Sequence, residues 1–194
     1  MKVELEKLKA EIGQCRLCEE RFGFTPHPVT FGKTNSKIMH ISQAPSKNVH
    51  LTLRSFNDAS GERLKYQWYQ ITDEEFYNSD NFYITSVGHC YPGKNKSGKD
   101  NPPPKNCRDL WLKRELELVK CKLYVIVGSY AAKYLFPNED FATLVFQDNV
   151  LNGKKALVLP HPSPLNMKWF MDHLDFEKKR IVEIRKIIKD VLKE

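Results

Sequence analysis

The sequence contains no apolar run approaching the ~20 residues that a membrane-spanning helix needs. It also lacks internal repeats, and its one low-complexity stretch, YPGKNKSGKDNPPPKN at 91–106, is typical of an exposed loop. The N-terminal segment MKVELEKLKAEIGQC is charged and amphipathic, so it has no apolar core of the kind that signal peptides carry. These absences argue against an integral membrane protein and a secreted one, and we expect a cytoplasmic protein.

Chain length and net charge further limit the expected class of protein. A chain of 194 residues, of which 41% are apolar, is long enough for a hydrophobic core, and we expect a single domain over 1–194. The net charge of +7 and the pI of 9.1 favour a polyanionic partner, although many basic proteins bind none. In the basic stretch 176–194 apolar residues recur at helical spacing, so its lysines are better explained as the solvent-facing side of a packed helix.

Predicted strands and helices alternate along the chain. Apolar runs predict strands at 37–42, 81–88, 122–128 and 155–160. Helical patterns are found at 3–11, 61–71, 107–119, 129–136 and 176–194. This alternation is typical of an α/β fold in which helices cover both faces of a parallel sheet.

Three of the predicted strands end in chemically unusual segments: SQAPS after the first, SVGHCYPG after the second and HPSPLN after the last. The carboxyl ends of parallel strands lie at one edge of a sheet, where α/β proteins bind their ligands. In HPSPLN the prolines on either side of His161 either stiffen an ordinary loop or hold the imidazole in one orientation. The convergence of three such segments favours an active site.

The chain has five cysteines. Cys15 and Cys18 form a CxxC pair, and Cys90 and Cys107 flank the polar loop after the second predicted strand. Four thiolates can hold zinc or an iron–sulfur cluster, and the spacing does not choose between them. The CxxC alone is also explained by two ordinary neighbouring cysteines. Cys121 stands at the start of a predicted strand and is expected to be a simple buried residue.

Together these segments resemble the uracil-DNA glycosylase superfamily, and within it the iron–sulfur branch of families 4 and 5. CRLC is similar to the CxxC of that branch, YITSVGHCYPG to its strand with the third cysteine, and NPPPKNCRDLWLKREL to its segment with the fourth. SQAPS occupies the place of the first motif, and HPSPLN is similar to the second. The resemblance implies a three-layer α/β/α sandwich around a short, mostly parallel sheet of about four strands. It also implies a [4Fe–4S] cluster, rather than zinc, on Cys15, Cys18, Cys90 and Cys107.

The resemblance further implies an activity: hydrolysis of the N-glycosidic bond of uracil or another deaminated base in DNA, after the nucleotide is flipped into a pocket. It assigns to His161 a hydrogen bond to the departing base anion. Phe56 would stack on the base, Leu165 would fill the gap that the flipped base leaves, and Ala44 and Asn166 would lie beside the substrate. The ordinary alternatives are a surface loop for His161 and core packing for Phe56 and Leu165.

Two parts of the sequence depart from the family pattern. Gln43 stands where relatives carry Glu, and Ala44 where others carry Asp or Asn, so no ionised group of the first motif positions the water. Ser86 replaces the Asn that reads the base, and a serine reads less. Asp58, in NDASG, matches the family 5 acid and is the candidate for activating water, although its position also fits a helix N-cap.

We therefore expect a monomeric DNA glycosylase of this superfamily, with DNA as its partner and no membrane. Two alternatives remain open at this point. One is a nucleic-acid binding module that kept the fold and the cluster but lost hydrolysis, which the missing acid of the first motif favours. The other is a hydrolase that acts on modified bases in RNA or in free nucleosides.

Overall fold

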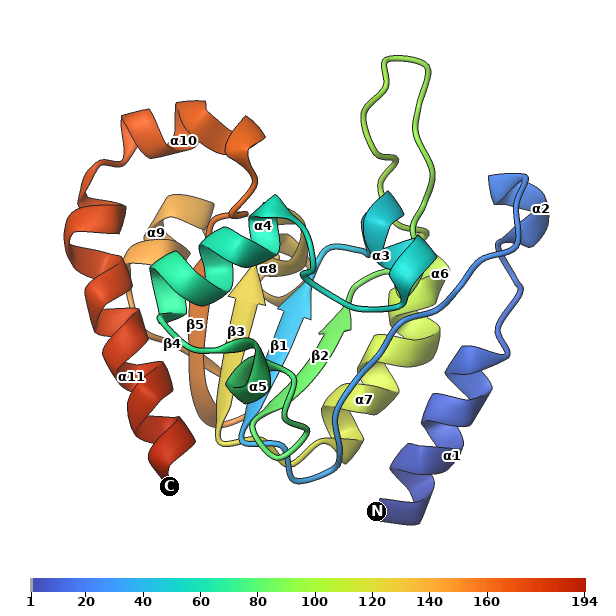
Figure 1. Cartoon of the computed structure of the whole chain (residues 1–194), viewed down its shortest axis with the longest axis horizontal. Helices are drawn as coiled ribbons and strands as arrows, with labels where there is room; N and C mark the ends of the chain where they lie inside the picture. Colours follow the sequence, from blue (N-terminus) through green and yellow to red (C-terminus); the bar gives the residue numbers. More distant parts are fainter. Residues whose placement is uncertain (1) are drawn as a thin grey trace.

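The computed structural model describes residues 2–194, and a twisted β-sheet forms its centre (Figure 1). The strands are β1 Ile38–Ser42, β2 Phe82–Ser86, β3 Leu123–Val127, β4 Asn149–Leu151 and β5 Lys154–Leu159. Within the described residues these five strands have the order β2-β1-β3-β5-β4. All neighbours are parallel except β4, which pairs antiparallel with β5 at one edge.

The parallel strands form where apolar runs can be buried on both faces of the sheet. Every residue of β1, β2 and β3 is buried, and each of the four predicted strands is present within a few residues of its expected bounds. The expectation of about four strands missed β4. This strand has only three residues and its Val150 is 69% exposed, so no apolar run marks it in the sequence.

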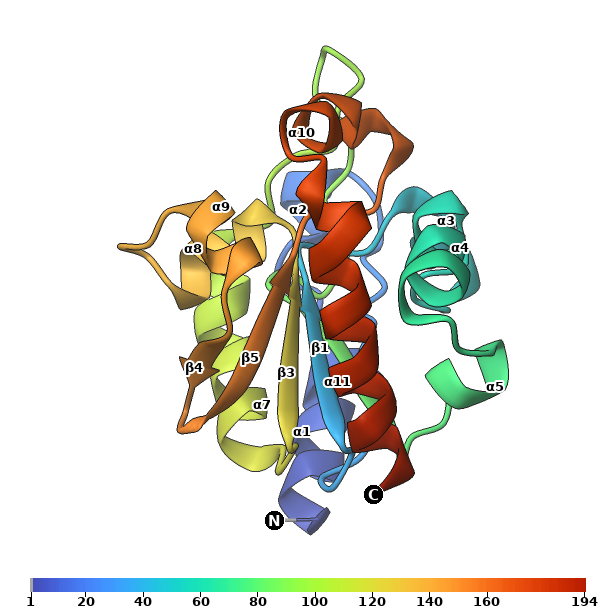
Figure 2. The same ribbon diagram turned by 90° about the vertical axis from the view of Figure 1, so that its left-hand side faces the viewer.

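The helices are α1 Lys2–Gly13, α2 Glu19–Phe22, α3 Lys47–Thr52, α4 Ala59–Glu62, α5 Asp73–Phe76, α6 Lys105–Cys107, α7 Lys113–Leu118, α8 Ser129–Leu135, α9 Phe141–Phe146, α10 Met167–Asp172 and α11 Ile181–Lys193. Seen along its edge in Figure 2, the sheet has α7, α8 and α9 on one side and α3, α4, α5 and α11 on the other. The expected α/β sandwich with three layers is therefore confirmed.

Three of the predicted helices contain a π-helical part, which periodicity did not predict. Arg63–Tyr69 continues α4, Arg108–Leu112 joins α6 to α7, and Phe176–Arg180 leads into α11. The segment Arg63–Tyr69 packs against α11, and α1 packs against α7. Among residues 2–194, every helix is too short or too polar to cross a bilayer.

The strand order creates a crevice at one end of the sheet. From β1 the chain passes to β2 on one side and then returns to β3 on the other, which is the arrangement that opens a ligand site at the carboxyl ends of the strands. In Figure 1 the two termini lie at the opposite end, whereas the loop 93–101 and α10 both stand above the carboxyl ends.

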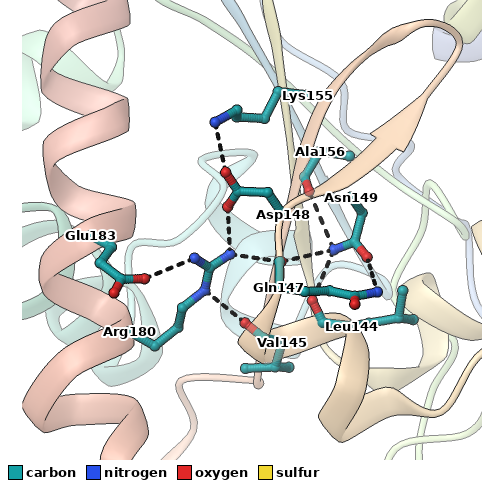
Figure 3. Close-up of polar contacts among 9 residues, drawn as sticks. All are labelled: Leu144, Val145, Gln147, Asp148, Asn149, Lys155, Ala156, Arg180 and Glu183. Carbon is teal, nitrogen blue, oxygen red and sulfur yellow. Dashed lines mark hydrogen bonds and ion pairs between the residues drawn. The ribbon is translucent and has the colours of Figure 1, made fainter.

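A buried arginine fastens the C-terminal helix to the edge of the sheet (Figure 3). The Arg180 guanidinium donates to the carbonyl oxygens of Val145, at 2.9 Å, and Gln147, at 2.7 Å. It also binds the carboxylates of Asp148, at 2.9 Å, and Glu183, at 3.0 Å. These bonds satisfy backbone carbonyl groups at the end of α9 and in the loop before β4, which are not paired within the sheet.

Candidate functional site

A cavity of about 360 Å³ opens where β1, β2 and β5 end. Most predicted site residues outside the cysteines line it: Gln43, Ala44, Phe56, Asp58, Ser86 and His161. Its other polar walls come from the side chains of Ser42, Ser46, Ser55, Ser60, Thr85, Asp100 and Ser163. The tertiary structure therefore brings together segments that lie more than a hundred residues apart in the chain.

His161 is held by the loop that follows β5. The backbone N–H of Ser163 donates to Nδ1 of the imidazole at 3.2 Å, and the Asn166 side chain donates to the His161 carbonyl oxygen at 3.2 Å. Because Nδ1 accepts a hydrogen bond, the proton of the neutral ring is on Nε2, which remains available as a donor. Burial lowers the pKa of His161, against the opposing effect of the Asp58 and Asp100 carboxylates, and this keeps the ring neutral near pH 7.

Phe56 reaches the cavity through an unusual backbone conformation. Its φ of 57° lies in the left-handed region, and its carbonyl oxygen approaches Gly61 so closely that a Cβ at that glycine would lie 1.8 Å away. Gly61 is therefore required for the tight turn between Phe56 and α4. The ring packs edge-on against His40, with centroids 4.9 Å apart, and also lines the cavity, so packing and access to a ligand are combined in one residue.

Asp58 has the two features that the sequence left as alternatives. Its carboxylate accepts the Gly61 N–H at 3.1 Å, which makes it the N-cap of α4, and the Ser46 hydroxyl at 3.0 Å. It also lines the cavity. Capping and contact with a ligand are thus compatible at this position, because a carboxylate has two oxygens and several lone pairs.

The first-motif turn and the end of β2 are tied together by their backbones. Val87 N–H donates to the Ser42 carbonyl at 2.9 Å, and Gly88 N–H donates to that of Gln43 at 3.0 Å. These bonds extend the β1–β2 pairing into the cavity wall. The Ser86 hydroxyl donates to the Gly88 carbonyl at 2.8 Å, so its proton is used inside its own turn.

Two predicted residues lie outside the cavity wall. Leu165 is 95% exposed, on the 3₁₀ turn Pro164–Asn166 that leads into α10, which excludes the alternative of core packing. Asn166 donates to the His161 carbonyl oxygen and therefore stabilises the loop rather than lining the cavity.

Asp100 is a cavity residue that sequence reasoning missed. It comes from the exposed loop 93–101 and pairs with Lys94 at 3.4 Å. Nothing in the sequence distinguishes this residue from the other polar residues of the loop, because its place depends on how the loop folds back over the strand ends.

A second cavity joins the four cysteines that the resemblance grouped. Cys15, Cys18, Cys90 and Cys107 all line it, together with apolar residues and prolines. A Cβ at Gly88 would lie 2.3 Å from the Pro103 side chain, so this glycine allows the Cys90 and Cys107 segments to pack closely. Cys121 is buried elsewhere, at the start of β3.

The chemistry of this second cavity suits a positively charged metal group. Burial and the neighbouring cysteines raise the pKa values of the Cys18 and Cys90 thiols, because four thiolates without a cation repel one another. In residues 2–194 no three His, Cys, Asp or Glu side chains are already arranged around the position of a single metal ion. Four cysteines line this cavity, which is the number of thiolates that a [4Fe–4S] cluster needs.

Comparison with known proteins identifies the family of this chain. Residues 29–188 match the model of the Uracil DNA glycosylase superfamily. The chain belongs to the uracil-DNA glycosylase superfamily. That match covers the three motif segments, the five strands and the cavity at the strand ends. Six residues that line the second cavity, Cys15 and Cys18 among them, lie before residue 29.

Two curated relatives in this superfamily are each named Type-4 uracil-DNA glycosylase. The protein of Sulfurisphaera tokodaii is 28% identical over 143 residues, which cover 72% of this chain and 62% of the relative. That of Archaeoglobus fulgidus is 27% identical over 135 residues, covering 68% and 63%. The chain thus spans slightly less than two thirds of the length of each relative.

Proposed function

We propose that the protein is a DNA glycosylase that hydrolyses the N-glycosidic bond of uracil or another deaminated base in DNA, and that it acts as a single-domain monomer. The observation that carries this proposal is the geometry of His161: Nδ1 is occupied by the Ser163 N–H, so Nε2 is left as the donor at the cavity. Membership of the superfamily and the names of the two relatives support the same reaction.

In this reaction the bond between the sugar C1′ and the base nitrogen breaks, and its electron pair leaves with the base. Water then adds to C1′ and loses a proton. The hydrogen bond from neutral His161 to a base oxygen strengthens as negative charge develops on that oxygen. The loop of His161 needs no rearrangement, because Ser163 and Asn166 already hold it.

We propose that Asp58 is the residue that activates the attacking water. Gln43 carries no charge, whereas the Asp58 carboxylate lines the same cavity and is oriented by Ser46 and Gly61. Those two donors hold the carboxylate in place and leave lone pairs for a water molecule.

The surroundings of the cavity suit a flipped nucleotide. Phe56 offers a ring to the base, and the exposed Leu165 is placed to enter the space that the base leaves in a duplex. Ser86 uses its proton internally, so it reads the base edge only as an acceptor, and the preference among deaminated bases is expected to be broad.

We further propose that Cys15, Cys18, Cys90 and Cys107 hold a [4Fe–4S] cluster. When bound, the cluster joins the N-terminal segment to the segments after β2 and before α7, a structural role in a hydrolysis that transfers no electrons. The four cysteines share one cavity, and burial and the neighbouring cysteines raise the pKa values of Cys18 and Cys90, as expected of a site that is completed by positive charge.

The decisive test is single-turnover base release from strands that contain uracil, hypoxanthine or xanthine, with His161→Ala as the variant. Loss of one preset donor costs on the order of 100-fold in rate, and we expect DNA affinity to change far less. If the wild type binds DNA but releases no base, or if His161→Ala is equally fast, a binding module of the same fold replaces this proposal. Release from RNA or free nucleosides alone would instead indicate the other hydrolase.

A further inference from the structure

A buried chain of polar side chains runs between the two cavities. Its centre is the carboxylate of Glu115 on α7, which is fully buried. One oxygen accepts the hydroxyls of Tyr83, at 2.8 Å, and Thr30, at 2.9 Å. The other accepts the Thr85 hydroxyl at 2.8 Å and lies 2.9 Å from Nε2 of His89. A buried carboxylate with four partners is a fixed point in the core.

At one end this chain reaches the cysteine cavity. The backbone N–H of His89 donates to Sγ of Cys107 at 3.3 Å, and Nδ1 of the His89 ring lies 3.6 Å from the same sulfur. The backbone and the side chain of His89 thus both contact the same sulfur. Hydrogen bonds to the ligand sulfurs are among the features that set the reduction potential of an iron–sulfur cluster.

At the other end the chain reaches the cavity at the strand ends. Thr85 lines that cavity, and its hydroxyl is bound to Glu115 and lies 3.1 Å from His89 Nε2. Ser86, which stands at the base-reading position, follows directly. Thr85, Ser86 and His89 therefore belong to one short stretch that is anchored on Glu115 and leads into Cys90.

A purely structural network would not need the histidine. Tyr83, Thr30 and Thr85 already pin Glu115 to the strand region and provide three hydrogen bonds for its carboxylate. His89 adds a fourth contact whose other side is a cysteine sulfur. The direction of the ring is explained by what it does for Cys107.

We propose that His89, oriented by Glu115, is a positioning residue that binds the sulfur of Cys107 and couples the cysteine site to the end of β2 in the base pocket. This inference rests on the proposed function, because it takes the cysteine cavity as the cluster site and the other cavity as the base pocket. It predicts that His89 raises the reduction potential of the cluster, because a polar imidazole beside the sulfur stabilises the more negative reduced form better than an apolar side chain does.

The test compares His89→Leu with the wild type and with His40→Leu, all as purified protein that contains the cluster. His40 is a matched control: it is also a fully buried histidine of the same sheet region, but it binds the Tyr69 hydroxyl, at 3.1 Å, and no cysteine. We expect a lower reduction potential by voltammetry in His89→Leu, and no shift in His40→Leu.

A second measurement tests whether His89 affects the base pocket. The ratio of affinities for a duplex with a non-cleavable uracil nucleotide and for an unmodified duplex is expected to fall in His89→Leu, while binding to the unmodified duplex stays the same. If His89→Leu does not fold, Glu115→Gln keeps the shape of the side chain but weakens the anchor, and a smaller shift of the potential in the same direction is expected.

The outcomes separate this inference from the proposed function. An unchanged potential in folded His89→Leu, or an equal shift in His40→Leu, overturns the inference alone. If the wild type contains iron and His89→Leu has the lower potential, but the wild type releases no base, the glycosylase proposal alone is overturned. A wild type that binds zinc in place of iron overturns the cluster assignment and this inference with it.

Discussion

Two buried polar networks of this protein differ in where they end. The Arg180 network at the sheet edge binds two backbone carbonyls and the carboxylates of Asp148 and Glu183, whose side chains are 41% and 61% exposed (Figure 3). The Glu115 network lies between two cavities, with only Thr30 and Cys107 partly exposed, and ends on the Cys107 sulfur and on Thr85 of the pocket wall. The Arg180 network binds only groups that hold the fold together, whereas the Glu115 network ends at residues of the two proposed functional sites.

The difference shows how to separate stabilising from functional polar groups. An arginine whose bonds go to loop carbonyls is explained completely by the need to satisfy the backbone. A buried histidine beside a cysteine sulfur is not. Its ring lies between the Glu115 carboxylate and the Cys107 sulfur, and among residues 2–194 no unsatisfied backbone group accounts for that position.

The largest expected effect comes from removing the centre of the inner network. Glu115→Ala leaves His89 and three hydroxyls buried without their acceptor, which costs about 3–5 kcal/mol of unfolding free energy. Urea denaturation measures this loss, with Glu117→Ala, at an exposed position of the same helix, as the control. A loss below about 0.5 kcal/mol, the usual range of a surface substitution, would contradict the view that this network is buried and complete.

A smaller loss is expected at the sheet edge. Arg180→Ala removes the donor to the Val145 carbonyl, while the Gln147 carbonyl keeps the Asn149 amide at 3.2 Å. The expected cost is about 1–3 kcal/mol, since the half-exposed carboxylates of Asp148 and Glu183 can return to water. The same denaturation experiment measures it, with the exposed Lys179→Ala as the control. Base release by the folded fraction should be unchanged. A selective loss of activity in this variant would break the distinction between the two networks.

The third effect is close to zero at pH 7 and develops only as the pH falls, and it concerns a buried histidine that has no carboxylate partner. Burial lowers the pKa of His40 to about 3. The unfolded chain therefore binds a proton below pH 6.5 that the folded chain excludes, so stability is full above pH 6.5 and falls as the pH drops towards 3. The slope from this residue is at most about 1.4 kcal/mol per pH unit.

Chemical denaturation between pH 7 and 4 tests this expectation. His40→Leu should flatten the acid side of the stability curve and leave the weaker slope that His161, whose pKa is also lowered by burial, contributes. An unchanged curve would show that acid loss of stability comes from other groups.

The strands and the broad position of the site could be predicted because their signals are local. A run such as LYVIV is apolar throughout, which only a strand buried on both faces explains well. The unusual segments after β1, β2 and β5 then had to meet at one edge, since parallel strands share a direction. The cysteine set, in contrast, depended on a family resemblance, because the spacing alone is equally compatible with zinc, with an iron–sulfur cluster and with ordinary cysteines.

The amino-acid sequence by itself determined the alternation of strands and helices, the motif segments at the strand ends and the chemical types available there. Only the tertiary structure decided that Ser163 fixes the tautomer of His161, that Asp100 folds over the pocket, and that Glu115 and His89 lie between the two cavities. The physical reason is range. Periodicity records which face of an element is buried, whereas a hydrogen bond between residues 26 positions apart, such as that of His89 and Glu115, exists only after the chain has closed around it.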